Sequence, residues 1–188
     1  FVTWRGKTRS PIDNLGVYPR TEKPLNISMA LGGSRSTVIK AAKLGLPVVL
    51  AMLGGNIVDF CNYAKLYRAV AQESGHDSDK LKFSVHAHGF VLNNSKETAD
   101  TFFPYIQYYR NHLLGERGFP PYTRSDFDYA RSSGQGLFVG GPEEVADKIM
   151  LLINHLNIDR FIIQMPLATM PHDIVKEAIS VYATKVIP

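Results

Sequence analysis

Residues 29–53 place two glycines, three hydroxyl side chains and an arginine between two apolar runs. Gly32 and Gly33 allow a sharp backbone turn and close approach to a ligand. Residues 34–37 read Ser-Arg-Ser-Thr and open a segment whose apolar positions recur at helical spacing as far as Gly45. Backbone N–H groups, hydroxyls and a guanidinium would then meet at one helix N-terminus, which is an arrangement that binds phosphate. The same pattern caps an ordinary helix without a ligand, so both interpretations remain open.

A second pair of candidate residues lies in the apolar stretch 82–92. His86 and His88 are two residues apart in this expected strand, so their side chains face the same side. A metal site needs more than two ligands, and no acidic or cysteine side chain stands nearby at ligand spacing, so we expect no metal. His88 stands nearer the end of the strand, before Gly89, and is a candidate for lining a ligand cavity.

Three other residues are weaker candidates for a functional role. Met165 lies near the C-terminal end of the last expected strand, where it could contact a bound ring system or simply fill the core. His172 follows a proline and fits a helix start better than a catalytic base, and Cys61 fits a small buried position in a helix. The sequence contains no nucleophile elbow, Walker loop or G-x-G-x-x-G fingerprint, so it identifies no catalytic residue.

Strands that alternate with helices would position these residues. The expected strands cover 25–31, 47–53, 82–92 and 160–167, and the expected helices cover 36–45, 57–74, a long segment capped by Ser95 and kinked at Pro104, a segment from Pro142, and 172–186. Apolar strands that are each followed by a helix indicate a parallel sheet covered by helices. Four such units are half of what an eight-stranded βα barrel needs, and an open doubly wound sheet is the alternative.

Two segments fall outside this alternation. Residues 1–24 are an extended lead-in, broken by three prolines and without a helix or strand pattern. Residues 119–141 are a turn-rich insertion with one short helix around 124–131. We therefore expect a single domain over residues 1–188, with four βα units between residues 25 and 188.

Composition narrows the class of protein. The chain has 188 residues, of which 45% are apolar and 20% charged, as expected of a globular protein with a real core. The apolar runs are too short to cross a membrane, no export signal is visible, and a single cysteine suggests a reducing cytoplasm. Residues 1–45 hold eight Lys/Arg against two Asp/Glu, which suits an anionic ligand. The basic residues come singly, which argues against a nucleic-acid partner.

The sequence resembles the C-terminal half of the bacterial luciferase-like monooxygenase family of flavin-dependent oxidoreductases. The residues that carry the resemblance, in the order and spacing typical of the family, are "VTWRGKTRSPIDNLGVYPR", "LGGSRSTVIKAAKLGLPVVLAMLGG", "HGFV", "FVGGPEEVADKI", "DRFIIQM" and "TMPHDIVKEAI". The resemblance implies an α/β fold that forms the C-terminal half of a TIM barrel, with parallel strands and outer helices. It also implies reduced FMN, or in some relatives a deazaflavin, at the C-terminal ends of the strands.

The resemblance further implies which residues bind the cofactor. The loop after the fifth barrel strand binds the flavin phosphate in this family, and here that loop is Gly32, Gly33, Ser34, Arg35, Ser36 and Thr37. Ser34 and Thr37 are the foremost side-chain contacts. His88 and Met165, chosen above from their positions at strand ends, are candidates for lining the cavity for the flavin ring or the substrate, and packing in the core is the alternative for each. The expected reactants are a small-molecule substrate and oxygen, and a flavin reductase is a further expected partner.

The chain lacks the first four βα units of such a barrel, from which the family draws much of its flavin-ring pocket. Phe1 begins within a loop and is not a methionine, so we expect a longer protein, a separate N-terminal half or a homo-oligomer. The alternative to an enzyme is therefore a non-catalytic half barrel that binds or supports other molecules and needs a partner chain.

Overall fold

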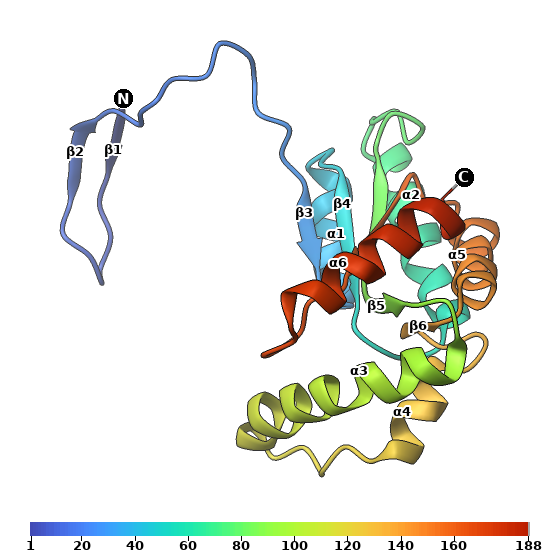
Figure 1. The fold of residues 1–188 in the computed structure, drawn as a ribbon. Helices are drawn as coiled ribbons and strands as arrows, with labels where there is room; N and C mark the ends of the chain where they lie inside the picture. The colour runs from blue at the N-terminus through green and yellow to red at the C-terminus, as the bar shows by residue number, and fades with distance from the viewer. Residues whose placement is uncertain (188) are drawn as a thin grey trace.

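The computed structural model describes residues 1–187 and shows an α/β fold (Figure 1). Its main sheet contains β3 (Met29–Leu31), β4 (Val48–Met52), β5 (Phe83–Val91), β6 (Phe138–Gly140) and β7 (Arg160–Gln164). The α-helices are α1 (Arg35–Lys43), α2 (Cys61–Glu73), α3 (Ser95–Tyr109), α4 (Arg124–Arg131), α5 (Pro142–Leu156) and α6 (His172–Val181). Short 3₁₀ helices form η1 (Ile57–Phe60) and η3 (Gly115–Arg117), and π-helical turns form η2 (Arg110–Leu114) and η4 (Tyr182–Val186).

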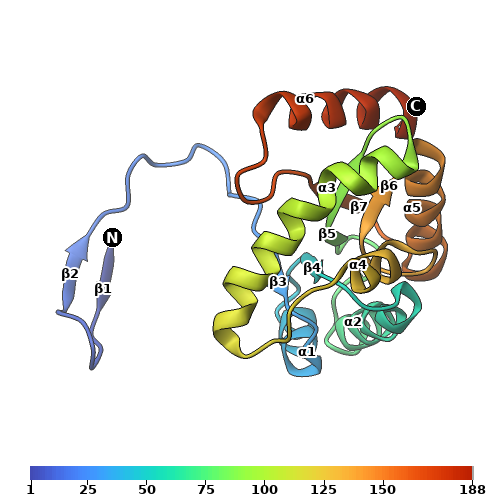
Figure 2. The ribbon, with the colours of Figure 1, turned by 60° about the horizontal axis from the view of Figure 1, so that its bottom comes forward.

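All pairings in the main sheet are parallel, which confirms the fold class expected from the sequence. The strand order begins β3-β4-β5. On its other edge, β5 pairs with two strands in succession: residues Ser84–His88 pair with β7, and residues Gly89–Val91 pair with β6. Helices α1, α2, α5 and α6 follow one another in an arc around the strands (Figure 2). Helices on one side of a curved parallel sheet are the arrangement of a barrel, whereas a doubly wound sheet carries helices on both faces.

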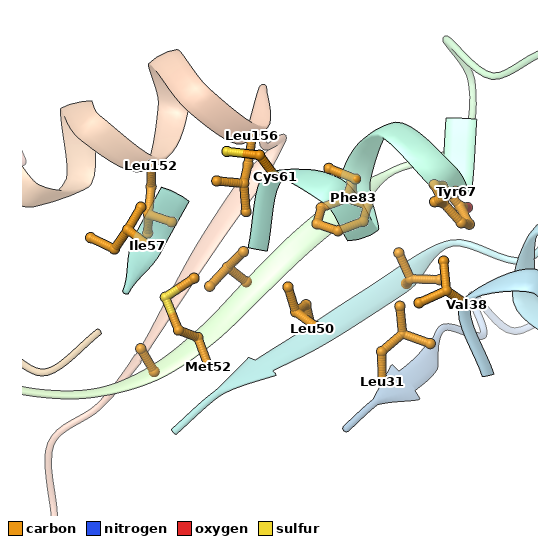
Figure 3. Packing of buried hydrophobic residues seen from close by; sticks show 14 of the residues in the cluster. Leu31, Val38, Leu50, Met52, Ile57, Cys61, Tyr67, Phe83, Leu152 and Leu156 are labelled. Atoms are coloured by element: carbon orange, nitrogen blue, oxygen red, sulfur yellow. The ribbon is translucent and has the colours of Figure 1, made fainter. Parts of the chain in front are cut away.

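The main core lies between the strands and these helices (Figure 3). Strand β4 alternates between buried and half-buried residues, with Val48, Leu50 and Met52 buried. In Figure 3, Leu50 and Met52 lie on the same side of the strands as Leu152 and Leu156 of α5 and the fully buried Tyr67 of α2. The apolar run 47–53 is therefore a strand with one face in the core and the other face half exposed.

The prediction that residues 1–24 contain no regular structure was wrong. This segment forms an antiparallel pair, β1 (Val2–Trp4) and β2 (Ile12–Leu15), which projects from the sheet on an extended connector (Figures 1 and 2). Pro11 immediately precedes β2 and Pro19 follows it, so these prolines border the strand instead of interrupting it. Proline at such positions costs the ladder no hydrogen bond.

Two local details also differ from expectation. Asn94, not Ser95, caps α3, because its Oδ1 accepts a hydrogen bond from the backbone N–H of Glu97 at 3.0 Å. Helix α3 contains Pro104 and continues beyond it to Tyr109. The short extended piece before Pro142 is a fifth strand of the sheet, β6, which adds to the four expected. The short helix expected around 124–131 is confirmed as α4.

Candidate functional site

The loop of residues 32–37 joins β3 to α1 at the C-terminal end of the strand. Ser34 is the N-cap of α1, and its Oγ accepts hydrogen bonds from the backbone N–H of Thr37 at 3.4 Å and from the Thr37 hydroxyl at 3.1 Å. The Ser36 hydroxyl lies 2.7 Å from the same Oγ. Three hydroxyl groups thus meet at one helix N-terminus, as the sequence spacing predicts, and the capping interpretation is confirmed.

The two glycines leave this helix end open. Gly33 has a φ of +84°, which a residue with a side chain adopts only at a cost. A Cβ at Gly32 would meet no atom within 4 Å, so the space beside this glycine, two residues before the N-cap, is open. The first-turn amides have no carbonyl one turn earlier to accept their hydrogens. Ser34, Arg35 and Ser36 are exposed to solvent, so hydroxyls, amides and a cation are available to an incoming anion.

The strand face that points away from the outer helices is called the inner face here. Strand alternation and the register of β3, β4, β5 and β7 place the following residues on it: Ala30, Val49, Ala51, Ser84, His86, His88, Arg160, Ile162 and Gln164. His86 aligns with Ala51 and Ile162, and His88 aligns with Gln164. The inner face therefore carries polar residues at both ends, Ser84 and Arg160 at the N-terminal end and His88 and Gln164 at the C-terminal end. Between them, His86 stands beside the apolar Ala51 and Ile162.

His86 and His88 share this face, as predicted, with ring centroids 6.4 Å apart. His88 is only 7% exposed, and its Nδ1 is buried without a hydrogen-bond partner. The ring of Tyr109, at the end of α3, meets the His88 ring edge-on at 5.7 Å. Burial lowers the pKa of His88 to about 4, with smaller contributions in the same direction from His86 and from the positive charge of Arg110. The imidazole is therefore neutral at physiological pH.

The other candidates from the sequence lie in the core or at helix ends. Met165 follows β7 and is 4% exposed, packed in a second apolar cluster with Phe90 and Leu167. Cys61 is buried, and His172 is the first residue of α6, as expected for both. Residues 1–187 contain no cluster of three or more His, Cys, Asp or Glu side chains that could hold a metal ion.

A cavity away from the 32–37 loop lies between α4 and α5. It has a volume of about 530 Å³ and is lined by Asp128, Arg131, Ser132, Ser133, Glu144, Asp147, Lys148 and Leu151. In it, Lys148 Nζ donates to the carbonyl oxygens of Arg131 at 3.1 Å and Leu137 at 2.5 Å, and burial lowers the pKa of Lys148 to about 7. These bonds tie the α4–β6 connection to α5, which gives Lys148 a structural role.

Sequence reasoning missed two aromatic residues beside the candidate groups. The Tyr63 hydroxyl of α2 would lie 3.9 Å from a Cβ placed at Gly33, so this phenol borders the loop. Tyr109 covers His88 at the point where α3 gives way to the π-helical turn η2. Both contacts join segments far apart in the sequence, and no local pattern marks them.

Comparison with protein families gives one match. The family model described as luciferase-like monooxygenase matches residues 1–156. A comparison with curated protein sequences gives no match. None of the helices in the described part of the chain is long and apolar enough to cross a membrane.

Solved structures share the fold. Monooxygenase RslO1 from Streptomyces bottropensis is 19% identical with a TM-score of 0.78, and the match covers 100% of this chain and 55% of RslO1. The oxygenating constituent of 3,6-diketocamphane monooxygenase from the CAM plasmid of Pseudomonas putida, in complex with FMN, is 16% identical with a TM-score of 0.65, over 86% of this chain and 47% of that one. Coenzyme F420-dependent tetrahydromethanopterin reductase from Methanopyrus kandleri is 17% identical with a TM-score of 0.56, over 86% and 50%. This chain spans about half the length of each.

Proposed function

Because the chain belongs to the luciferase-like monooxygenase family, we propose that it is part of a flavin-dependent oxidoreductase or monooxygenase. In this proposal the 32–37 loop binds the phosphate of FMN, and His88 and Met165 line the cavity for the flavin ring or the substrate. The substrate is a small molecule that reacts together with oxygen, and a flavin reductase supplies the reduced flavin. We place the protein in the cytoplasm, where its single cysteine stays reduced.

The observation that carries this proposal is the convergence of three hydroxyls at an open helix N-terminus. The positive end of a helix dipole and free amides favour a phosphate there. The Ser36 and Thr37 hydroxyls each form a hydrogen bond with the Ser34 hydroxyl, and each of the three can turn to donate to a phosphate oxygen. Arg35, exposed in the same turn, adds the only formal charge among these six residues, and it is positive.

The residues present fit FMN at its phosphate end. The space in front of Gly32 is free of atoms, and no acidic side chain stands within residues 29–45 to repel an anion. When bound, the flavin would supply the redox chemistry, either hydride transfer or reaction with oxygen. The chain's own residues would hold the phosphate, orient the ring and shape the cavity. Neighbours with FMN and with coenzyme F420 support a flavin or a deazaflavin, and the phosphate loop would serve either.

A comparison of FMN with riboflavin tests the proposal. The two differ only in the phosphate, so we expect FMN to bind the full protein at least about tenfold more tightly, since hydrogen bonding to a charged group contributes about 1.5–3 kcal/mol. Flavin fluorescence quenching measures both affinities. Equal affinities would exclude a phosphate site, and failure of both ligands to bind would remove the flavin proposal itself.

A second candidate function, a half barrel that binds or supports a partner chain, is favoured by the exposure of the sheet. Val49, Ala51 and Ile162 on the inner face are each half buried. Within residues 1–187, β3 pairs only with β4, and β7 pairs only with β5. Unpaired strand edges and apolar surface favour association with another chain.

This exposure predicts that the 188-residue chain associates in solution. Sedimentation velocity, with intact-mass measurement, should give a mass of at least two chains, because pairing the edges and covering the inner face both remove apolar surface from water. A stable monomer of 20.9 kDa would contradict this expectation. Association without flavin binding would favour the second candidate function over the first.

A further inference from the structure

His88 is the one histidine for which the structure records a buried ring nitrogen without a hydrogen-bond partner, among the residues it describes. A buried polar atom left unpaired costs free energy, and native structures rarely keep one without a reason. The residue lies on the inner face near the C-terminal end of β5, beside Gln164 of β7. In parallel βα folds this end of the sheet is where ligands bind.

His88 is covered on one side by a residue at a helix end. Tyr109 covers its ring at 5.7 Å and is the last residue of α3 before the π-helical turn that starts at Arg110. π-Helical turns are uncommon and often mark functional positions. On the inner face, the ring centroid of the half-buried His86 lies 6.4 Å from that of His88, so the buried His88 ring borders a partly exposed part of that face.

We propose that His88 contacts the bound ligand, and that its Nδ1 forms a hydrogen bond with a neutral carbonyl, imide or hydroxyl group that reaches it from the inner face, beside His86. This inference rests on the proposed function in one respect, since that polar group belongs either to the flavin or to the substrate. In both cases the unpaired nitrogen gains the partner that the protein does not supply.

The charges around His88 select a neutral group. The titratable or charged groups that face it are His86 on β5, Tyr109 on α3 and Arg110 on η2. A neutral imidazole cannot form an ion pair with a carboxylate. The Arg110 guanidinium is already engaged with another side chain, since its central carbon lies 4.4 Å from the centroid of the Tyr122 ring. On the inner face, the uncharged Gln164 aligns with His88, and the apolar Ala51 and Ile162 align with His86. The ligand class is therefore a polar oxygen or N–H group on an apolar or aromatic body.

Nitrogen NMR of the full protein labelled with ¹⁵N-histidine tests this assignment. The probes are FMN, cyclopentanone, cyclopentanol and, as a matched hydrocarbon, cyclopentane, with the last three at equal concentration. We expect a saturable shift of the His88 Nδ1 resonance with FMN or with one of the two oxygen compounds, and none with cyclopentane. A shift with FMN alone assigns the group to the flavin, and a shift with the ketone or alcohol assigns it to the substrate. No shift with any of them, or an equal shift with cyclopentane, would overturn the proposal.

Two variants separate a ligand contact from a structural role. H88F keeps an aromatic ring without nitrogen, and we expect it to weaken binding of the shifting probe about fivefold to tenfold, the equivalent of one hydrogen bond. H112Q changes an exposed histidine on η2 and should leave affinity unchanged. If H88F binds the probe as tightly as the unmodified protein, His88 makes no such bond. Because FMN binding is measured separately by fluorescence, failure of the proposed function remains distinguishable from failure of this inference.

Discussion

Replacing Ser34 and Thr37 together by alanine is expected to weaken FMN binding by about 1–3 kcal/mol, because two hydroxyl hydrogen bonds to a charged phosphate are lost. This corresponds to a rise in Kd of roughly fivefold to 150-fold. The two side chains stand at the N-terminus of α1, and their oxygens lie 3.1 Å apart. Flavin fluorescence quenching of the full protein, at fixed ionic strength, gives the two affinities.

The double variant also removes the cap of α1, so a control must separate helix stability from ligand contact. Aspartate caps helices as well as serine does, and its charge favours the helix N-terminus. S34D should therefore keep α1 stable in denaturant unfolding and still bind FMN poorly, because its carboxylate repels the phosphate. S74A, at the exposed C-terminal end of α2, should bind FMN like the unmodified protein. Tight FMN binding by S34D would contradict a phosphate site in this loop.

Sequence patterns predicted the elements whose signals are local. Strand β4 and helices α1, α4 and α6 begin within a residue or two of their predicted positions, since apolar periodicity and capping residues define them. The β1–β2 hairpin escaped prediction because its strands have three and four residues and bury almost nothing. Such strands carry no alternation between core and solvent, and that alternation is the signal on which strand prediction depends.

In the candidate site, too, the contacts between residues close in sequence were predictable and those between distant residues were not. The hydroxyl cluster of residues 34–37 was predictable, because residues at i and i+3 around an N-cap meet by helix geometry alone. The shared face of His86 and His88 followed from strand periodicity. Neither Tyr109 over His88 nor Tyr63 beside Gly33 could be foreseen, since each contact depends on how a distant helix packs against the sheet.

Truncation of Leu50 to alanine should destabilise the protein by about 2–5 kcal/mol, the range for fully buried leucines. Leu50 is fully buried in the middle of β4, where it aligns with Leu31 of β3 and Val85 of β5 (Figure 3). Its loss removes apolar burial and leaves a cavity that flanking strands, held by their hydrogen bonds, cannot fully close. Guanidinium chloride unfolding, followed by circular dichroism, measures the change in the free energy of unfolding.

The matched control is L44A, because Leu44 ends α1 with 55% of its surface exposed and should cost less than about 1 kcal/mol. A cost of under 1 kcal/mol for L50A would mean that β4 is not packed against its neighbours as described.

The alternation of side chains along β4 gives a second expectation, for FMN affinity. Leu50 faces the helices, whereas Ala51 faces the inner side of the sheet. L50A should therefore retain the FMN affinity of the unmodified protein under conditions where it is folded, since Leu50 lies in the core and does not contact the ligand in the proposed function.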